Sequence, residues 1–286
     1  MTLGEELREA SRALRMRGIP DPSLEAQVLL SHALGLSRAQ LLARPERPLS
    51  PAELEVVRGI AARRLQREPS AYILNRREFF GRDFYVDRRV LIPRPETELL
   101  VEKALALARG LGSELLIAEV GTGSGAIAIS LALELPRARL FAMDVSPEAL
   151  QVAGINSQRY GLDGHVRLIQ GDMLSSLPAP VHIVVANLPY VPDGDELAPE
   201  LLYEPALALR GGPDGLDALR AFLLQVGPGL LEGGSILLEI GAGQEADVRR
   251  LILAHFPGAG VSSFRDLGGI PRVVQVTPRG GTRRID

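Results

Sequence analysis

From about residue 97 onward, apolar stretches of strand length alternate with stretches of helical pattern. Apolar strands are expected at Leu115–Val120, Leu140–Asp144, Val166–Gln170, Val181–Ala186 and Ser235–Ile240. Helical patterns occur near 97–109, 126–134, 147–160, 215–231 and 244–255. This alternation predicts a doubly wound, mostly parallel sheet with right-handed crossovers. Two last apolar pieces, near 259–265 and 272–277, have no helix between them and should pair antiparallel, so the α/β sheet has seven strands.

The chain before residue 97 has a different character. Residues 1–68 predict a small helical domain, because they contain three capping boxes, at Thr2/Glu5, Ser37/Gln40 and Ser50/Glu53, and a further helix expected between Asp21-Pro22 and Gly35. Residues 69–96 predict a β-hairpin linker, from aromatic and β-branched pieces at Tyr72–Leu74, Glu78–Gly81 and Phe84–Val86 around a turn at Gly81-Arg82-Asp83. The expected domains are therefore 1–68, 69–96 and 97–286.

Composition excludes several kinds of site. With no cysteine, the chain has no disulfide, thiolate zinc site or cysteine nucleophile. The four histidines lack metal-ligand spacing, so we expect no metal, and the single lysine, Lys103, does not follow a glycine as in a P-loop. The charged N-terminus is not that of a signal peptide, and no apolar run reaches membrane-spanning length, which predicts a cytoplasmic protein.

Charge is distributed unevenly along the chain. Residues 1–94 contain 17 Arg against 12 Asp and Glu, whereas the whole chain has a net charge of −3. A basic first segment could bind an acidic protein or RNA, or it could be a solvated helical surface.

A glycine-rich segment joins the first expected strand of the sheet to its helix. It reads Glu119-Val120-Gly121-Thr122-Gly123-Ser124-Gly125, and its glycines allow a ligand to lie against the backbone. Asp144 ends the next strand, where a carboxylate can accept hydrogen bonds from both hydroxyls of a ribose. The pair indicates an adenosine-containing ligand but leaves NAD and S-adenosylmethionine both open.

Two further segments end expected strands at the same edge of the sheet. Asp172 could accept a hydrogen bond from an adenine amino group, and the polarizable sulfur of Met173 could pack on the ring, although an ordinary turn would have the same sequence. Asn187-Leu188-Pro189-Tyr190 follows the strand Val181–Ala186. The Asn187 side-chain oxygen and a neighbouring carbonyl are acceptors that can hold both hydrogens of a planar NH2 group, and the Tyr190 ring can cover it.

These motifs together resemble class I S-adenosylmethionine-dependent methyltransferases of the amino-group type, which have a Rossmann-like fold. The flanking segments Ile92–Glu98, Tyr72-Ile73, Glu78–Gly81 and Tyr203-Glu204-Pro205 are similar to those of the release-factor glutamine methyltransferases, the PrmC/HemK family. The resemblance covers nearly the whole chain. One position departs from it, because the family's Asn-Pro-Pro-Tyr is Asn-Leu-Pro-Tyr here.

The resemblance implies methyl transfer from S-adenosylmethionine to the side-chain amide nitrogen of the glutamine in the Gly-Gly-Gln loop of peptide chain release factors. It implies a monomer whose protein partner is the release factor, with no stable nucleic-acid partner, and an N-terminal domain that recognises the substrate. Asn187, Leu188, Pro189 and Tyr190 would be catalytic and would bind the glutamine together with Arg94 and Glu204. The cofactor would contact Glu119, Gly121, Thr122, Gly123, Ser124, Gly125, Asp144, Val145, Asp172, Met173 and Asn187.

Three alternatives remain at this point. A methyltransferase acting on adenine or cytosine would use the same tetrapeptide on a flipped base, but the acidic second part of the chain and the lack of a base-reading domain disfavour it. A NAD-dependent oxidoreductase would leave Asn187–Tyr190 without a role. A non-catalytic adaptor would be expected to have a broken motif.

Overall fold

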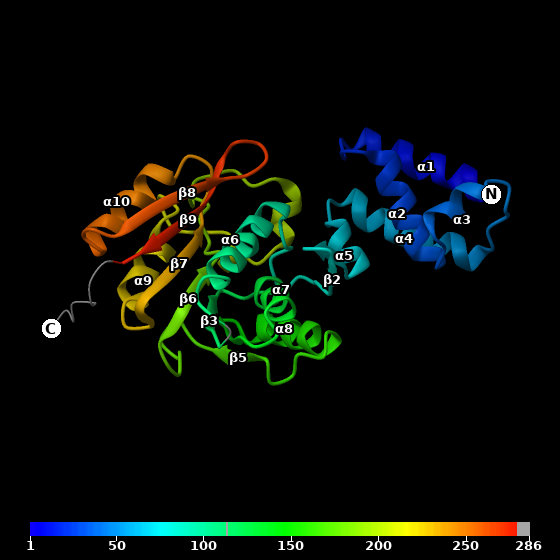
Figure 1. The fold of residues 1–286 in the computed structure, drawn as a ribbon. Coiled ribbons are helices and arrows are strands. Elements are labelled where there is room, and N and C mark those ends of the chain that lie inside the picture. The colour runs from blue at the N-terminus through cyan, green and yellow to red at the C-terminus, as the bar shows by residue number, and fades with distance from the viewer. Residues whose placement is uncertain (113, 279–286) are drawn as a thin grey trace. The chain divides into compact units, whose positions relative to one another are not determined.

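The computed structural model describes residues 1–112 and 114–278, which form two compact units (Figure 1). The first, here called the helical unit, comprises Met1–Arg76 and the later segment Leu197–Tyr203. The second, the α/β unit, comprises Arg77–Glu196 and the described chain from Glu204 onward. Each unit has hydrophobic cores of its own.

The helical unit is built from short helices whose ends follow the sequence. They are α1 (Leu3–Met16), α2 (Pro22–Leu34), α3 (Arg38–Ala43), α4 (Pro51–Leu65) and α5 (Ser70–Leu74). The three predicted capping boxes are confirmed, since Thr2, Ser37 and Ser50 each accept a hydrogen bond from the backbone three residues later. Gly35 ends α2 in the left-handed conformation, as predicted, whereas the Asp21 side chain makes no cap hydrogen bond.

The segment Leu197–Tyr203, which contains the 3-10 helix η2 (Pro199–Tyr203), is held to the helical unit by polar contacts. Arg64 and Arg67 donate hydrogen bonds of 3.1 and 3.0 Å to the Glu200 carboxylate. The Tyr203 hydroxyl donates one of 2.7 Å to the Gln66 carbonyl. The chain therefore leaves the α/β unit a few residues after Tyr190, joins the helical unit, and returns at Glu204.

The predicted hairpin is present, but two of its details are wrong. Strands β1 (Arg77–Phe79) and β2 (Arg82–Phe84) pair antiparallel. The expected turn at Gly81–Asp83 lies instead at Phe80-Gly81, both at positive φ, as a tight hairpin turn requires. Tyr72–Leu74 are helical rather than extended, because the turn of α5 between Pro69 and left-handed Asn75 buries Tyr72 and Ile73.

The seven-stranded sheet of the α/β unit confirms the predicted fold class. Its strand order is β5-β4-β3-β6-β7-β9-β8, parallel from β5 to β7 and antiparallel where β9 pairs with β7 and β8. The strands are β3 (Leu116–Val120), β4 (Arg139–Asp144), β5 (Val166–Gln170), β6 (Val181–Ala186), β7 (Leu230–Glu239), β8 (Gly260–Arg265) and β9 (Pro271–Thr277).

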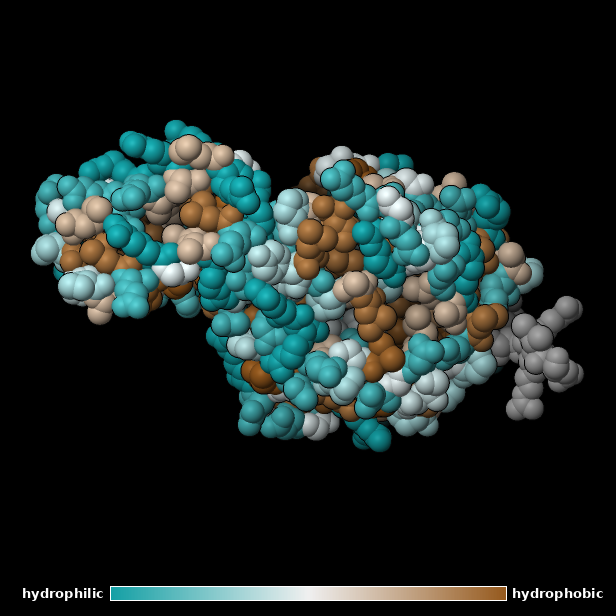
Figure 2. All heavy atoms as spheres, turned by 180° about the vertical axis from the view of Figure 1, so that it is seen from behind, coloured by the Kyte–Doolittle hydropathy of each residue, from teal (hydrophilic) through white to brown (hydrophobic). Residues whose placement is uncertain are grey.

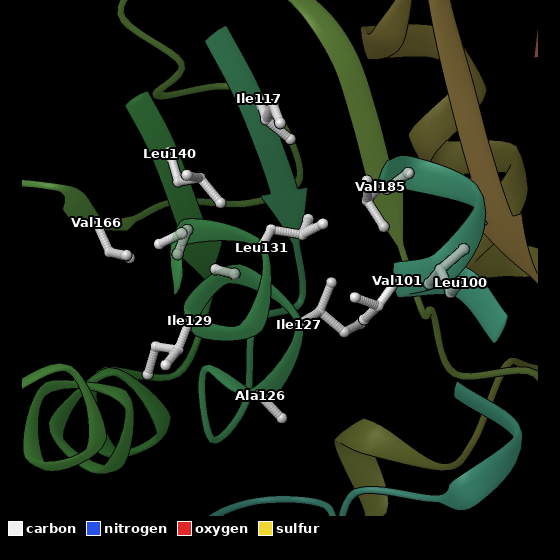
Figure 3. Packing of buried hydrophobic residues seen from close by; sticks show 14 of the residues in the cluster. Leu100, Val101, Ile117, Ala126, Ile127, Ile129, Leu131, Leu140, Val166 and Val185 are labelled. Atoms are coloured by element: carbon white, nitrogen blue, oxygen red, sulfur yellow. The ribbon is translucent and has the colours of Figure 1, made fainter. Parts of the chain in front are cut away.

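Helices cover both faces of this sheet, because successive residues of each strand point to opposite sides. One core packs α6 (Glu98–Ala108) and α7 (Ala126–Glu134) on Ile117, Ile183 and Leu237. Figure 3 shows Ile127 of α7 directed toward Val101 of α6. The other core packs α9 (Asp217–Val226) and α10 (Glu245–His255) on the opposite face. The remaining helices of this unit are α8 (Pro147–Arg159), η1 (Pro95–Thr97) and η3 (Ala206–Ala208).

The predicted helix near 215–231 is too long. Helix α9 ends at Val226, and β7 begins at Leu230. The Gly227-Pro228-Gly229 segment explains the difference, since proline and glycine both disfavour helix continuation.

Hydrophilic residues predominate on the face shown in Figure 2, with small hydrophobic patches among them. Within the described residues, no helix is both long enough and apolar enough to cross a membrane.

Candidate active site

The glycine loop lies between β3 and α7, as predicted, and its backbone needs glycine. Gly121, Gly123 and Gly125 have φ values of +73°, +55° and +80°. A Cβ atom at Gly125 would lie 2.9 Å from Ile129 Cδ1, so this glycine lets the loop pack against its own helix. A Cβ atom at Gly123 would meet no protein atom within 4 Å. The space beside Gly123 is therefore open to a ligand.

Glu119 is buried beneath this loop and stabilises it through hydrogen bonds. Its Oε2 accepts hydrogen bonds from Thr122 Oγ1 at 2.6 Å and from the Ala128 amide at 2.9 Å. Burial raises the pKa of Glu119 to about 8, although these two hydrogen bonds oppose the shift. Both partners belong to the loop and its helix, so Glu119 fixes the loop conformation, and its contact with a cofactor stays a prediction.

Asp144, at the end of β4, faces the glycine loop. Its Oδ2 accepts a hydrogen bond of 2.8 Å from the Gly123 amide, and its Oδ1 accepts one of 3.0 Å from the Ser146 amide. Burial raises its pKa, and the backbone hydrogen bonds oppose that shift. An ionised carboxylate has about four acceptor sites. The acceptor capacity not used by the backbone amides of Gly123, Val145 and Ser146 suits a ribose hydroxyl beside Gly123, and the Val145 side chain is exposed next to it.

The other predicted cofactor residues lie around the same edge of the sheet. Ser124 is buried, and its carbonyl accepts a hydrogen bond of 2.8 Å from Asn156 Nδ2. Asp172 and Met173 form the turn after β5, with Met173 at a φ of +49°, unusual for a residue other than glycine. The side chain of Met173 packs partly against the core of the α/β unit. Their contacts with an adenine ring stay predictions.

Asn187–Tyr190 follow β6, directly beside the glycine loop. Strands β3 and β6 are parallel neighbours in which Val120 pairs with Ala186. A Cβ atom at Gly121 would lie 3.6 Å from the Asn187 carbonyl oxygen. The strand order therefore brings the two predicted motifs together at the carboxyl edge of the sheet, the edge where open α/β sheets bind ligands.

The Asn187 amide is oriented by a residue of η1. Its Nδ2 donates a hydrogen bond of 3.3 Å to Thr97 Oγ1, which turns Oδ1 to the opposite side of the amide group. The next side chain, Leu188, is 7% exposed and packs into the core of the α/β unit. The side chain is thus part of the core, and contact of the Leu188 carbonyl with a substrate stays a prediction.

Tyr190 is fixed through its backbone and lines a small pocket. Gln244 Nε2 donates a hydrogen bond of 3.0 Å to the Tyr190 carbonyl, while the Gly241 amide donates one of 2.9 Å to Gln244 Oε1. Burial raises the pKa of the Tyr190 hydroxyl. Leu188, Pro189 and Tyr190 line the pocket with residues from α9, β7 and α10, including Glu239.

Arg94 and Glu204, both predicted to bind substrate, bind each other. Arg94 Nη2 lies 2.5 Å from Glu204 Oε1, and the Ile92 amide donates a hydrogen bond of 3.0 Å to Glu204 Oε2. The pair joins the proline-rich segment before α6 to the segment after Tyr190. Contact of either residue with a substrate stays a prediction.

Sequence reasoning missed three residues of this region: Thr97, Glu239 and Gln244. Glu239 had a recognisable signal, since it is the one acid in the apolar strand Ser235–Ile240 and stands at the carboxyl end of that strand. Thr97 lies in the segment Ile92–Glu98 that carries the family resemblance, but nothing there singles out its side chain, and Gln244 had no signal. Across 1–112 and 114–278, no three His, Asp or Glu side chains gather in a way that could hold a metal ion.

Known proteins similar to this chain agree with the resemblance drawn from the motifs. Residues 5–74 match the model of the PrmC N-terminal domain, and residues 117–203 match that of a methyltransferase domain. Release factor glutamine methyltransferase of Moorella thermoacetica is 46% identical over 258 residues, covering 89% of this chain and 90% of the relative. The Bordetella pertussis protein of the same name is 46% identical over 257 residues, covering 88% and 93%.

Solved structures support the fold. A methyltransferase from Pyrococcus furiosus aligns with a TM-score of 0.51 at 18% identity, covering 76% of this chain and 96% of its own. The hMettl16 catalytic domain aligns with a TM-score of 0.57 at 14% identity, covering 78% and 83%. With curated relatives this similar over almost their full length, the chain belongs to the release factor glutamine methyltransferase family.

Proposed function

We propose that this protein transfers a methyl group from S-adenosylmethionine to the side-chain amide nitrogen of the glutamine in the Gly-Gly-Gln loop of a peptide chain release factor. The observation that carries the proposal is the fixed orientation of Asn187, whose Nδ2 is held by Thr97 so that Oδ1 faces away as an acceptor. The proposal includes a monomeric enzyme of the cytoplasm without a stable nucleic-acid partner.

The residues present fit S-adenosylmethionine. The open space beside Gly123 would admit an adenosyl group against the backbone, and Asp144 keeps acceptor capacity for a ribose hydroxyl. Asp172 and Met173 would lie at the adenine. When bound there, S-adenosylmethionine would supply the methyl group from a sulfonium, a leaving group that would depart as a neutral thioether with the electrons of the S–C bond.

The protein's task is to hold a poor nucleophile. An amide nitrogen reacts badly because its lone pair is delocalised into the carbonyl. Asn187 Oδ1 and the Leu188 carbonyl would each accept one N–H of the glutamine amide, which fixes the nitrogen and directs its lone pair at the methyl group. Alignment of this kind can account for about 7–11 kcal/mol of an activation barrier.

The same acceptors act on the charge that develops during the reaction. As the new N–C bond forms, positive charge grows on the nitrogen, and two acceptor oxygens stabilise it. The ring of Tyr190 can add a cation–π contribution of roughly 0.5–2 kcal/mol. After methyl transfer the nitrogen gives one of its protons to water, so that the product is a neutral N-methyl amide.

Mass spectrometry of a purified release factor after incubation with the protein and S-adenosylmethionine tests this function. We expect one added methyl group on the glutamine of the Gly-Gly-Gln loop, and none on a release factor whose loop glutamine is replaced by glutamate. DNA and RNA are included as competing substrates. Methylation of nucleic acid with an unmodified release factor would overturn the proposal.

A further inference from the structure

A buried carboxyl group at the end of β7 has no part in the mechanism above. Glu239 is 6% exposed, and its Oε2 accepts no hydrogen bond from any residue in the described chain. Burying a carboxylate without full pairing costs free energy. A group maintained at such a cost, beside the reacting site, needs an explanation.

Glu239 stands next to the residue that holds the substrate. Strands β6 and β7 are parallel neighbours in which Ala186 pairs with Leu238, so the residues that follow, Asn187 and Glu239, leave the sheet side by side. Thr97 reaches the same place from η1 and accepts the hydrogen bond of Asn187 Nδ2 at 3.3 Å. The side chains of Thr97 and Asn187 are both close enough to Glu239 to favour its charged form.

The surroundings of Glu239 bring the pKa of its carboxyl close to physiological pH. Burial raises its pKa to about 7, Thr97, Arg272 of β9 and Asn187 oppose the rise, and Glu96 of η1 adds to it. Tyr190 also faces this carboxyl, but burial raises the pKa of its phenol, so it stays uncharged as Glu239 titrates. Both forms of Glu239 are therefore populated near pH 7.

We propose that Glu239 is a positioning residue whose ionised carboxylate, together with Thr97, fixes which way the Asn187 amide faces. A carboxylate only accepts hydrogen bonds. It therefore draws the NH2 end of the amide toward itself and Thr97, and the Oδ1 end faces the glutamine of the release factor. The inference rests on the proposed function, because it concerns the same acceptor.

Protonation reverses this preference. A carboxylic acid can donate, so protonated Glu239 can hold the Oδ1 end of Asn187 and turn the NH2 end toward the substrate. Two NH2 groups facing each other cannot form a hydrogen bond. The acid form of Glu239 thus favours an Asn187 amide that cannot grip the glutamine, and methyl transfer should increase as Glu239 ionises.

Single-turnover rates measured against pH, at saturating S-adenosylmethionine and release factor, test the proposal. For the wild-type protein we expect a rise through pH about 7. Glu239→Gln should lose this rise and react about tenfold more slowly at pH 8, since it removes the acceptor-only partner of the amide. Glu232→Gln, an exposed position on the same strand, is the matched control and should keep both the rate and the pH profile.

Thr97 provides an independent arm of the same test. Thr97→Ser keeps the hydroxyl and should retain the wild-type rate within a few-fold, whereas Thr97→Val keeps the shape and should slow transfer to a similar extent as Glu239→Gln. All three variants should bind S-adenosylmethionine with wild-type affinity. The two Thr97 variants should have the melting temperature of the wild type, and that of Glu239→Gln should be equal or higher, because this variant removes a buried charge.

The outcomes separate this inference from the proposed function. A wild-type protein that does not methylate the release factor contradicts the function itself. A wild-type protein that does, with Glu239→Gln keeping its rate and its pH-dependent rise, overturns only the positioning role. A Glu239→Gln variant that loses cofactor affinity and folding together with its rate also overturns it, because Glu239 would then be merely structural.

Discussion

The backbone amide of Gly123 donates a hydrogen bond of 2.8 Å to the carboxylate of Asp144. This contact joins the loop after β3 to the end of β4, and the second oxygen of Asp144 binds the Ser146 amide at the start of α8. One carboxylate thus organises the loop and also presents the remaining acceptor sites to a ligand. Substitution of either residue should therefore change the affinity for the cofactor.

The first prediction concerns cofactor affinity. Asp144→Ala removes the acceptor for the ribose, and Gly123→Val fills the open space beside the loop. Asp144→Ala should weaken S-adenosylmethionine binding about ten- to a hundredfold, the cost of losing a hydrogen bond to a charged group, and Gly123→Val should weaken it to a similar extent because its side chain occupies the space of the ligand. Isothermal titration calorimetry measures this, and NAD should show no binding to the wild type.

The matched control for Gly123→Val is Gly161→Val. Gly161 has a similar φ of +65°, and a Cβ atom there also meets nothing within 4 Å, so the backbone strain is comparable. This variant should bind the cofactor as the wild type does. Unchanged affinity in both Asp144→Ala and Gly123→Val would refute the placement of the adenosyl group.

The second prediction concerns pH and stability. The pKa of Glu119 is about 8 in the folded protein against an ordinary value of 4.5, so the folded state binds the proton more tightly than the unfolded state. The free energy of unfolding should therefore fall as pH rises from about 4.5 to about 8. Glu119→Gln can still accept from Thr122 and Ala128, and it does not ionise.

Melting temperatures at pH 5 and pH 9 check this prediction. The stability of Glu119→Gln relative to the wild type should increase from the lower pH to the higher one. Titration of Glu239 affects both proteins alike and cancels in the comparison. If the melting temperatures of Glu119→Gln and the wild type differed by the same amount at both pH values, Glu119 would be ionised throughout this range.

Much of the cofactor region could be predicted because its parts are local. Gly121–Gly125 and Asp144 stand directly at the ends of apolar strands, so finding the strands also finds the edge of the sheet. The capping residues Thr2, Ser37 and Ser50 were equally predictable, since each acts on its own helix. Such features depend on spacing along the chain and on little else.

The grouping of Thr97, Asn187 and Glu239 depends on contacts between distant segments. The βαβ pattern favours β7 as a neighbour of β6, but it does not specify the register that sets Glu239 beside Asn187, or that η1 reaches the same edge. The sequence pattern therefore predicts only a strand position for Glu239. For Tyr72 the local pattern was itself misleading. Its preference for extended structure is overridden, because Tyr72 is buried as part of helix α5.

The third prediction concerns the helical unit, whose proposed role is recognition of the release factor. Arg8, Arg12 and Arg15 are exposed and spaced to share one face of α1. Reversing all three to glutamate should raise KM for an intact release factor about tenfold, because complementary charge strengthens encounter with an acidic partner. A short Gly-Gly-Gln peptide should be methylated as before.

The control reverses three exposed arginines of the α/β unit, Arg109, Arg137 and Arg139, and so makes the same change in net charge. Its KM for the release factor should stay near that of the wild type. Equal effects of the two triple variants would indicate a general charge effect, and an effect on the peptide substrate would indicate a role in folding.

The fourth prediction concerns residue 188, where the family's proline is leucine. The structure buries the Leu188 side chain in the core of the α/β unit, so Leu188→Pro should lower stability by about 1–3 kcal/mol through altered packing. Proline leaves the backbone carbonyl in place and favours an extended Asn187. Single turnover should therefore remain within a few-fold of the wild type, as measured below the melting temperature of the variant.

Asn187 is the residue on which the account depends, because its Oδ1 is the acceptor that holds the reacting amide. The decisive measurement is the single-turnover rate of Asn187→Ala on a release factor at saturating S-adenosylmethionine. We predict a loss on the order of a hundredfold, the effect of removing one group from a preorganised transition-state site, with cofactor affinity almost unchanged. A rate within a few-fold of the wild type would contradict the account.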